Sequence, residues 1–219
     1  GLRCGQLRMS SEKFDTSCRR CSRLGDFLDQ IKAQHPSYHC APVPPFGDPN
    51  ARFLLVGLAP GMHGANATGR PFTGDHAGIL LYQTLYRFGF SSRPESVDSN
   101  DGLSLIDCRI TNAVKCLPPA NKPTGLETRT CNPFLASELR DLPQGAVILA
   151  LGGLAHGAVL RALDLRASEY RFGHGAVFPL EGLTLIDSYH CSRYNTNTRR
   201  LTAEMFEAVF RQVRRCLAG

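Results

Sequence analysis

Residues 56–78, VGLAPGMHGANATGRPFTGDHAG, hold the side chains best suited to chemistry. The six glycines and two prolines of this stretch disfavour regular structure and let the backbone approach a ligand closely. The stretch joins an apolar run, residues 52–56, to a helical pattern from residue 76 onward, where an open α/β sheet usually places its site. A flexible surface connection is the plainer interpretation. The polar and aromatic side chains argue against it: His63, Asn66, Phe72 and Asp75.

Residues 64–71 have the glycine spacing of the loop that cradles phosphates in nucleotide triphosphatases. That loop needs a lysine followed by a serine or threonine, where this chain has Arg70 and Pro71. Pro71 offers neither an N–H group to a phosphate nor a hydroxyl to magnesium. The sequence therefore excludes a nucleotide triphosphatase of this type.

Four cysteines have a spacing that suits metal binding. Cys18 and Cys21 form a C-x2-C pair, a common half-site because both thiolates can reach one metal. Cys116 and Cys131 follow far downstream, each two residues before a proline. Four thiolates suit either zinc or an iron–sulfur cluster, and spacing alone does not choose. The plainer alternative is a helix that happens to carry two cysteines.

Two further segments carry polar side chains near or just after the ends of predicted strands. Asn112 lies near the end of an apolar run, and its amide has both the donor and the acceptor needed to read a base edge such as that of uracil. Residues 188–200 follow the last strand and contain His190 with hydroxyls, amides and arginines that can hold phosphates. The plainer interpretations are a turn asparagine, a packed histidine and a solvated loop. The candidate DNA contacts in this last loop are Ser192, Arg193, Tyr194 and Asn195.

The elements that must position these residues alternate along the chain. Apolar runs predict strands at 52–57, 105–114, 146–151 and 183–187. Helical patterns lie at 14–32, 76–88 and 132–141, and the first of them carries Cys18 and Cys21. A fourth helix follows residues 152–153 and ends near residue 163, and a fifth begins after Thr202, its predicted N-cap. Strands alternating with helices indicate an α/β fold with a mostly parallel four-stranded sheet and helices on both faces.

Length and composition limit the possible domain count, partners and cellular location. The 219 residues suffice for one domain, 1–219, with an N-terminal metal-binding segment. A formal charge of +6 permits a nucleic-acid partner without requiring one. No apolar run is long enough to span a membrane, and no signal-peptide pattern opens the chain, so we expect an intracellular protein. Nine cysteines in a reducing compartment favour metal binding over disulfides.

The segments GLAPGMHGANATGRPFTGDHAG, ITNAVKCLPPANKPT and SYHCSRYNTNTRRLT, in this order, resemble the iron–sulfur-containing family 5 of the uracil-DNA glycosylase superfamily. PVPPFGDPNARFLLVG also fits, so the resemblance covers most of the chain. It implies a three-layer α/β/α sandwich with a parallel central sheet, the uracil-DNA glycosylase fold. It also implies removal of deaminated bases from DNA. By analogy the metal is a structural 4Fe–4S cluster on Cys18, Cys21, Cys116 and Cys131, with zinc as the alternative.

The resemblance also assigns roles. Asp75 would orient or activate water, although an Asp before a helix is also a favoured N-cap. His190 would donate a hydrogen bond to the base oxygen. Phe72 would stack on the flipped base, Asn112 would read its edge, and Arg193 and Tyr194 are candidates for the wedge that fills the vacated stack. The remaining candidates line the pocket or place water or phosphate: Gly57, Ala59, Gly61, His63 and Asn66.

Four positions depart from related families. Leu58 and Ala59 stand where an acidic or amide residue is usual, so the first loop has no such group to position water. Gly61 replaces the ring that excludes thymine's methyl group, which should admit hypoxanthine or modified uracils. Cys191 follows His190, where proline or valine is usual.

The expected function is therefore a monofunctional DNA-repair glycosylase, acting as a monomer on double-stranded DNA with the damaged base flipped out. Its expected location is cytoplasmic and nucleoid-associated. The alternative is a non-catalytic, zinc-stapled module that binds nucleic acid. A zinc base deaminase is excluded, because its His-x-Glu and Pro-Cys-x-x-Cys motifs are missing.

Overall fold

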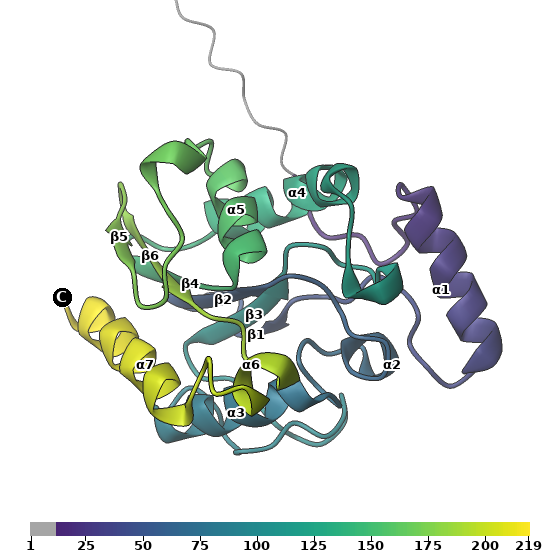
Figure 1. Ribbon diagram of the computed structural model, residues 1–219, viewed down its shortest axis with the longest axis horizontal. Coiled ribbons are helices and arrows are strands. Elements are labelled where there is room, and N and C mark those ends of the chain that lie inside the picture. Colours follow the sequence, from purple (N-terminus) through teal and green to yellow (C-terminus); the bar gives the residue numbers. More distant parts are fainter. Residues whose placement is uncertain (1–11) are drawn as a thin grey trace, which may run out of the picture.

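A mixed six-stranded sheet forms the centre of the molecule (Figure 1). The computed structural model describes residues 12–219, so residues 1–11 of the predicted domain lie outside it. The strand order is β1-β3-β2-β4-β6-β5, and the four inner strands are parallel. These four are β2 (Phe53–Gly57), β3 (Cys108–Asn112), β4 (Ala146–Leu151) and β6 (Leu183–Ser188). The four predicted strands and their parallel arrangement are thus confirmed, but the sheet has six strands rather than four.

Two short antiparallel strands at the edges were not predicted. They are β1 (Phe46–Gly47), which pairs with β3, and β5 (Val177–Pro179), which pairs with β6. Segments of two and three residues are too short to show the period-two pattern of a strand, so only pairing with a neighbour reveals them.

Helices cover both faces of the sheet, which gives the predicted three layers (Figure 1). Alternate residues of β2 point to opposite sides: Phe53 and Leu55 join one buried cluster, and Leu54 and Val56 join another. The first cluster contains side chains from α3 (His76–Arg87) and α7 (Ala203–Ala218). The second contains side chains from α4 (Gly125–Arg140) and α5 (Gly153–Ala162). A strand buried on both faces reads as a continuous apolar run, which is why the sequence revealed it.

The first helix begins later than predicted. Helix α1 spans Ser22–Gln34, so Cys18 and Cys21 lie before it rather than on it. The Asp15 carboxylate accepts hydrogen bonds from the N–H (2.9 Å) and the hydroxyl (2.7 Å) of Ser17. This side-chain turn satisfies the backbone without a helix. The prediction of a helix over 14–32 was therefore wrong at its start, and the C-x2-C pair lies on an irregular segment.

Helix α4 begins seven residues before its predicted start at 132, at Gly125. A capping box starts it: the Thr124 hydroxyl accepts from the Glu127 N–H (3.1 Å), and the Glu127 carboxylate accepts from the Thr124 N–H (3.0 Å). The T-x-x-E pattern of this capping box lies in the sequence before Pro133, a proline that the helix accommodates in its interior. Cys131 therefore lies on a helix and not in the predicted loop.

The predicted polar loop after β6 contains a short helix, α6 (Arg193–Asn197). Ser192 caps it, accepting from the Asn195 N–H at 3.2 Å. Thr202 caps α7 as predicted, accepting from the Met205 N–H at 3.2 Å. Three further short elements complete the fold: α2 (Ala65–Thr68), η1 (Pro119–Asn121) and η2 (Ala167–Glu169). Among the helices within residues 12–219, none combines the length and the apolarity that crossing a bilayer requires.

Candidate active site

A cavity of about 670 Å³ opens beside the carboxyl ends of β2, β3 and β6. Its walls come from the glycine-rich loop after β2, the start of α3, the segment after β3 and the segment after β6. The parallel strands bring these distant segments together because their carboxyl ends meet at one edge of the sheet. Asp75 and His190, which are far apart in the sequence, both line this cavity.

Asp75 caps helix α3 and also faces the cavity. Its Oδ1 accepts a hydrogen bond from the Gly78 N–H at 3.1 Å. Its Oδ2 lies against the glycine-rich loop, where a Cβ on Gly64 would come within 2.4 Å of it and a Cβ on Gly61 within 3.3 Å. Burial raises the pKa of the carboxyl above its usual value, while the Gly78 N–H opposes this rise. One oxygen is thus bound to the helix and the other is available to a ligand.

His190 presents a neutral imidazole to the same cavity. Burial lowers its pKa to about 4, so the ring is uncharged at neutral pH. The Asn195 side chain donates to the His190 carbonyl at 2.8 Å and fixes the backbone that carries the ring. The His190 and Phe72 rings lie 5.8 Å apart at 34°. This arrangement suits a hydrogen-bond donor beside a stacked aromatic ligand.

Phe72 and Asn112 meet at Gly57, the last residue of β2. A Cβ on Gly57 would lie 2.5 Å from Asn112 Oδ1 and 2.6 Å from Phe72 Cζ, so only glycine lets both side chains approach. Asn112 is 3% exposed, and its Oδ1 has no hydrogen-bond partner. A buried amide oxygen without a partner is costly and calls for a donor. Because Asn112 lines the cavity, a ligand can supply that donor.

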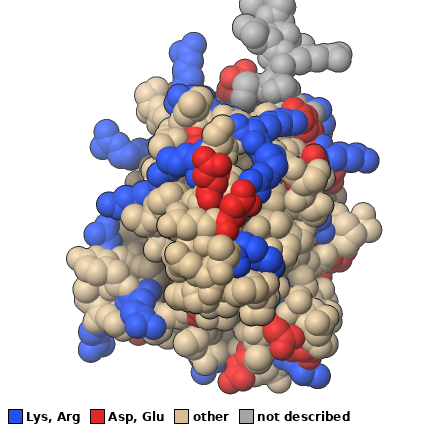
Figure 2. All heavy atoms as spheres, turned by 90° about the vertical axis from the view of Figure 1, so that its right-hand side faces the viewer, with Lys and Arg blue, Asp and Glu red and all other residues tan. Residues whose placement is uncertain are grey.

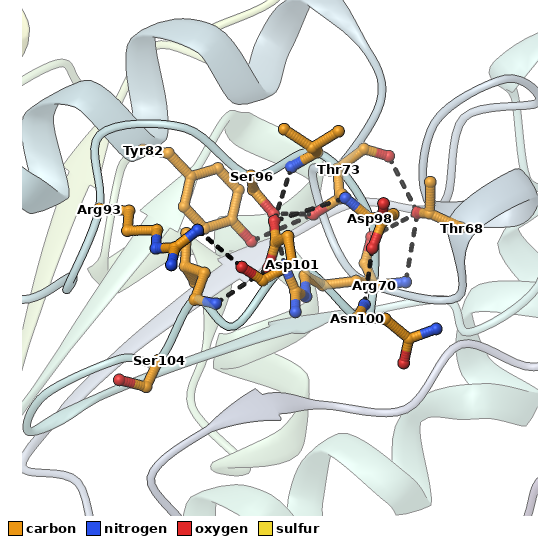
Figure 3. A network of polar contacts seen from close by, with 12 residues as sticks. Thr68, Arg70, Thr73, Tyr82, Arg93, Ser96, Asp98, Asn100, Asp101 and Ser104 are labelled. Carbon is orange, nitrogen blue, oxygen red and sulfur yellow. Dashed lines mark hydrogen bonds and ion pairs between the residues drawn. The ribbon is translucent and has the colours of Figure 1, made fainter.

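Phe72 adopts a strained backbone conformation, with φ at 54°. Contacts hold the residues on both sides of it. The Tyr82 hydroxyl donates to the Pro71 carbonyl at 2.8 Å. The Thr73 and Ser96 hydroxyls lie 2.6 Å apart (Figure 3). Contacts of the flanking residues therefore hold the backbone of Phe72 in its strained conformation, as expected where strain serves a site.

A buried ion pair ties this loop to residues 93–104 (Figure 3). Arg70 Nη1 lies 2.9 Å from Asp101 Oδ1 and donates to the Ser96 hydroxyl at 3.0 Å, and its guanidinium stacks over the Phe46 ring. Both partners of the pair are at least nine-tenths buried. Arg70 and Thr73, which flank Pro71 and Phe72, are thus both anchored to Ser96 of the same loop.

Asp101 should make stability depend on acidic pH. Burial alone raises its pKa, but N–H groups of Leu103 and Val97 and the Arg70 guanidinium lower it to about 2. Because the folded pKa is below the unfolded value, this contribution is full above about pH 4 and is lost as pH falls toward 2. It amounts to about 2 kcal/mol. Urea unfolding should show that Asp101→Asn loses this free energy at pH 7.

The control for that experiment is Asp98→Asn, an exposed carboxylate in the same loop that accepts from the Asn100 N–H at 2.7 Å. It should leave the unfolding free energy nearly unchanged. Equal losses in both variants at pH 7 would contradict the special role of Asp101.

Not all of the other predicted pocket residues line the cavity. Ala59, Gly61 and His63 line the cavity, and His63 Nδ1 lies 2.8 Å from the Tyr38 hydroxyl. Asn66 does not line it: the side chain is fully buried on α2, and its Nδ2 donates to the Met62 carbonyl at 3.4 Å. The structure therefore does not bring Asn66 into this cavity, where it was predicted to place water or phosphate.

Of the four predicted DNA contacts, two line the cavity, and two have side chains that support the local structure. Arg193 lines the cavity and Tyr194 is 73% exposed beside it on α6. Ser192 lines the cavity but its hydroxyl caps α6, and Asn195 holds the His190 carbonyl. His76, which the sequence patterns did not indicate, also lines the cavity, and its Nε2 lies 3.1 Å from the Thr196 hydroxyl. Its only signal was its place directly after Asp75.

Cys18, Cys21, Cys116 and Cys131 line one separate small cavity between α1 and α4. Burial, with a smaller contribution from the neighbouring cysteines, raises the pKa of Cys116 to about 12 and that of Cys131 to about 11. The Cys131 sulfur accepts from the Lys115 N–H at 3.4 Å. Within residues 12–219, no three His, Cys, Asp or Glu side chains are placed to hold a single metal ion. The donor set and the shared cavity nevertheless fit a thiolate-bound group.

Charge does not mark a functional surface on the face that carries α1. Figure 2 shows basic side chains spread over that face with acidic ones among them. Several of them pair: Arg19 with Asp29 at 2.6 Å and Arg23 with Glu127 at 2.5 Å. The cavity is a better guide to the site than the net charge.

Comparisons with known proteins agree with this geometry. Residues 44–214 match the sequence profile of the uracil DNA glycosylase superfamily. A type-5 uracil-DNA glycosylase of Thermus thermophilus is 48% identical over 210 residues, 93% of this chain and 95% of the relative. Relatives of the same name from Pyrobaculum aerophilum and Mycobacterium leprae are 44% and 43% identical, over 90% and 92% of this chain and 87% and 92% of their own lengths. The resemblance seen in the sequence is thus confirmed, and the chain belongs to the type-5 family of the uracil-DNA glycosylase superfamily.

Proposed function

We propose that this protein is a hydrolase that cleaves the N-glycosidic bond of uracil in double-stranded DNA and leaves an abasic site. Its relatives are named uracil-DNA glycosylases. The observation that carries the proposal is the single cavity shared by Asp75, His190, Phe72 and Asn112. We further propose that the protein acts as a monofunctional monomer, inside the cell, on a flipped-out base.

The reaction develops positive charge on the sugar and negative charge on the leaving base. Flipping the nucleotide costs a few kcal/mol, which contacts in the cavity must offset. Water adds to C1′ of the sugar while the bond to the base breaks and its electron pair leaves on the base. Asp75 Oδ2 orients this water, accepts its proton and faces the cationic sugar. The neutral His190 imidazole donates a hydrogen bond to the base oxygen as its charge grows.

Selectivity follows from the shape of the pocket. Phe72 stacks on the base, and Asn112 reads its Watson–Crick edge with the unpartnered Oδ1 accepting from a ring N–H. Gly61 leaves the wall beside Asp75 without a side chain. We therefore include hypoxanthine and modified uracils among the substrates. On the outer rim, Arg193 and the exposed Tyr194 fill the vacated stack.

Asn112→Ala should lower excision of uracil more than excision of hypoxanthine, by about 10-fold, the equivalent of one lost hydrogen bond to a buried group. A purine carries its reading edge farther from the sugar than a pyrimidine does and gains more from stacking, so it should depend less on Asn112. Single-turnover rates on matched duplexes measure this, with the exposed Asn100→Ala as control. Equal losses on both bases would remove the base-reading role of Asn112.

One assay tests the proposed function itself. The protein is incubated with a duplex containing a single uracil, and free uracil and the abasic site are measured together. Release of both in equal amounts is expected. A protein that binds the duplex, contains zinc and releases no base would instead be the non-catalytic module.

We also propose that Cys18, Cys21, Cys116 and Cys131 hold a structural 4Fe–4S cluster. Four thiolates around one zinc ion would all lie about 2.3 Å from it. Four thiolates that line one cavity suit zinc or an iron–sulfur cluster, and the resemblance to the iron–sulfur-containing family favours the cluster. The cavity lies apart from the one that holds Asp75 and His190, so the cluster takes no part in a bond-breaking step.

Anaerobically purified protein should therefore be brown, and iron and sulfide assays should find about equal amounts of each, four per chain, as in a 4Fe–4S cluster. Cys131→Ser should lose the colour and lower the melting temperature, while the excision rate of the protein that remains folded changes little. Cys216→Ser, outside the cysteine cavity, is the control. Colourless wild-type protein with one zinc would contradict the cluster.

A further inference from the structure

Lys115 lies almost fully buried between the base-reading Asn112 and Cys116, with 1% of its surface exposed. Its ammonium donates to the Asn112 carbonyl at 2.8 Å and to the Thr111 hydroxyl at 2.5 Å. It also donates to the Glu138 carboxylate of α4, at 3.0 Å. The Thr111 hydroxyl in turn donates to Glu138 at 3.0 Å. Every donor of the lysine therefore has a partner.

Stability alone does not account for such a pair. Desolvating a lysine and a carboxylate costs about as much as their attraction returns, and apolar residues of similar volume often serve as well. The geometry of the contacts is more informative. Of the three partners of the ammonium, one is the peptide carbonyl of Asn112 itself.

The backbone of Lys115 is also fixed on both sides. Its N–H donates to the Cys131 sulfur at 3.4 Å, and its carbonyl accepts from the Val43 N–H at 2.8 Å. The residue thus joins the cysteine cavity to the end of β3, where Asn112 enters the base cavity. A side chain that must read a base has to stay within about 0.5 Å of its productive position.

We propose that Lys115, anchored by Glu138 and Thr111, is a positioning residue that holds Asn112 for base recognition. The ammonium fixes the Asn112 peptide so that the unpartnered Oδ1 stays between Gly57 and the bound base. This inference rests on the proposed function, because it assigns Asn112 the role of reading the base. Lys115 itself does not contact the substrate.

A double-mutant cycle tests the inference. Lys115→Met and Glu138→Gln are introduced together, so that neither charge stays buried alone, in the wild-type and in the Asn112→Ala background. With Asn112 present, kcat/KM on uracil should fall about 10-fold, and the preference for uracil over hypoxanthine should shrink. With Asn112 absent, the same pair should cost less than about 2-fold, because coupled residues are not additive. Equal losses in both backgrounds, or no loss at all, would overturn the proposal.

Two physical measurements separate a positioning effect from loss of the fold or of the cluster. Melting temperature reports whether the fold survives, visible absorbance reports whether the proposed cluster survives, and exposed Lys13→Met is the control. If the pair variant does not fold, Thr111→Val in the same two backgrounds decides the question, because it removes only the hydroxyl between Lys115 and Glu138. A wild-type protein that releases no uracil would refute the proposed function instead.

Discussion

Replacing His190 with alanine should slow uracil release about 100- to 1000-fold, the usual effect of removing one donor from a site that stabilises a developing anion. The ring lies in the cavity with Phe72 5.8 Å away, and burial lowers its pKa to about 4. The neutral form is therefore already populated at physiological pH. The excision rate should not change as pH falls from 8 through about 6.5, where an exposed histidine would titrate. Single-turnover rates over this pH range measure both effects.

The leaving group offers a further test of the same residue. A base that carries negative charge more easily, such as 5-fluorouracil, needs less help from His190. The His190→Ala variant should therefore lose less activity on that base than on uracil. His39→Ala, whose ring contacts the Pro42 carbonyl outside the cavity, is the control. An equal loss on both bases would mean that His190 shapes the pocket without stabilising the base.

The sequence predicted well the parts of the fold that local patterns determine. Residues 146–151 form an unbroken apolar run because β4 is buried on both faces. Thr202 and Asp75 both cap the helices that they were expected to precede. The segments after the strands could be assigned to one edge of the sheet, since parallel strands leave no other arrangement.

Local sequence patterns did not predict features that depend on contacts between segments far apart in the chain. Arg70 and Asp101 lie 31 positions apart, and nothing in either segment predicts the ion pair that supports Phe72. Lys115 reads as an ordinary strand-end lysine until Glu138 on α4 is placed beside it. Asn66 resembled a polar pocket residue because the sequence does not show which face of the short helix α2 is buried.

Asp75→Asn should slow excision about 100- to 10,000-fold, the range of a lost general base. Asparagine caps a helix as well as aspartate does, so the contact with the Gly78 N–H survives and only the charge is lost. Burial raises the pKa of Asp75 in the folded state. The wild-type rate should therefore fall as pH is lowered through a value above that of an exposed aspartate, and the variant should lack this decline.

The stability of this variant separates catalysis from capping. An acid whose folded pKa exceeds its unfolded pKa destabilises the protein above both values, because the unfolded state releases the proton more readily. Removing the charge by Asp75→Asn should therefore leave the melting temperature at neutral pH unchanged or higher, while excision falls. Asp75→Ala, which also loses the cap, should be less stable than Asp75→Asn by about 1 kcal/mol. If Asp75→Asn retained near-full excision, the carboxylate would be a cap alone. The water and the sugar cation would then need another partner among the residues that line the cavity.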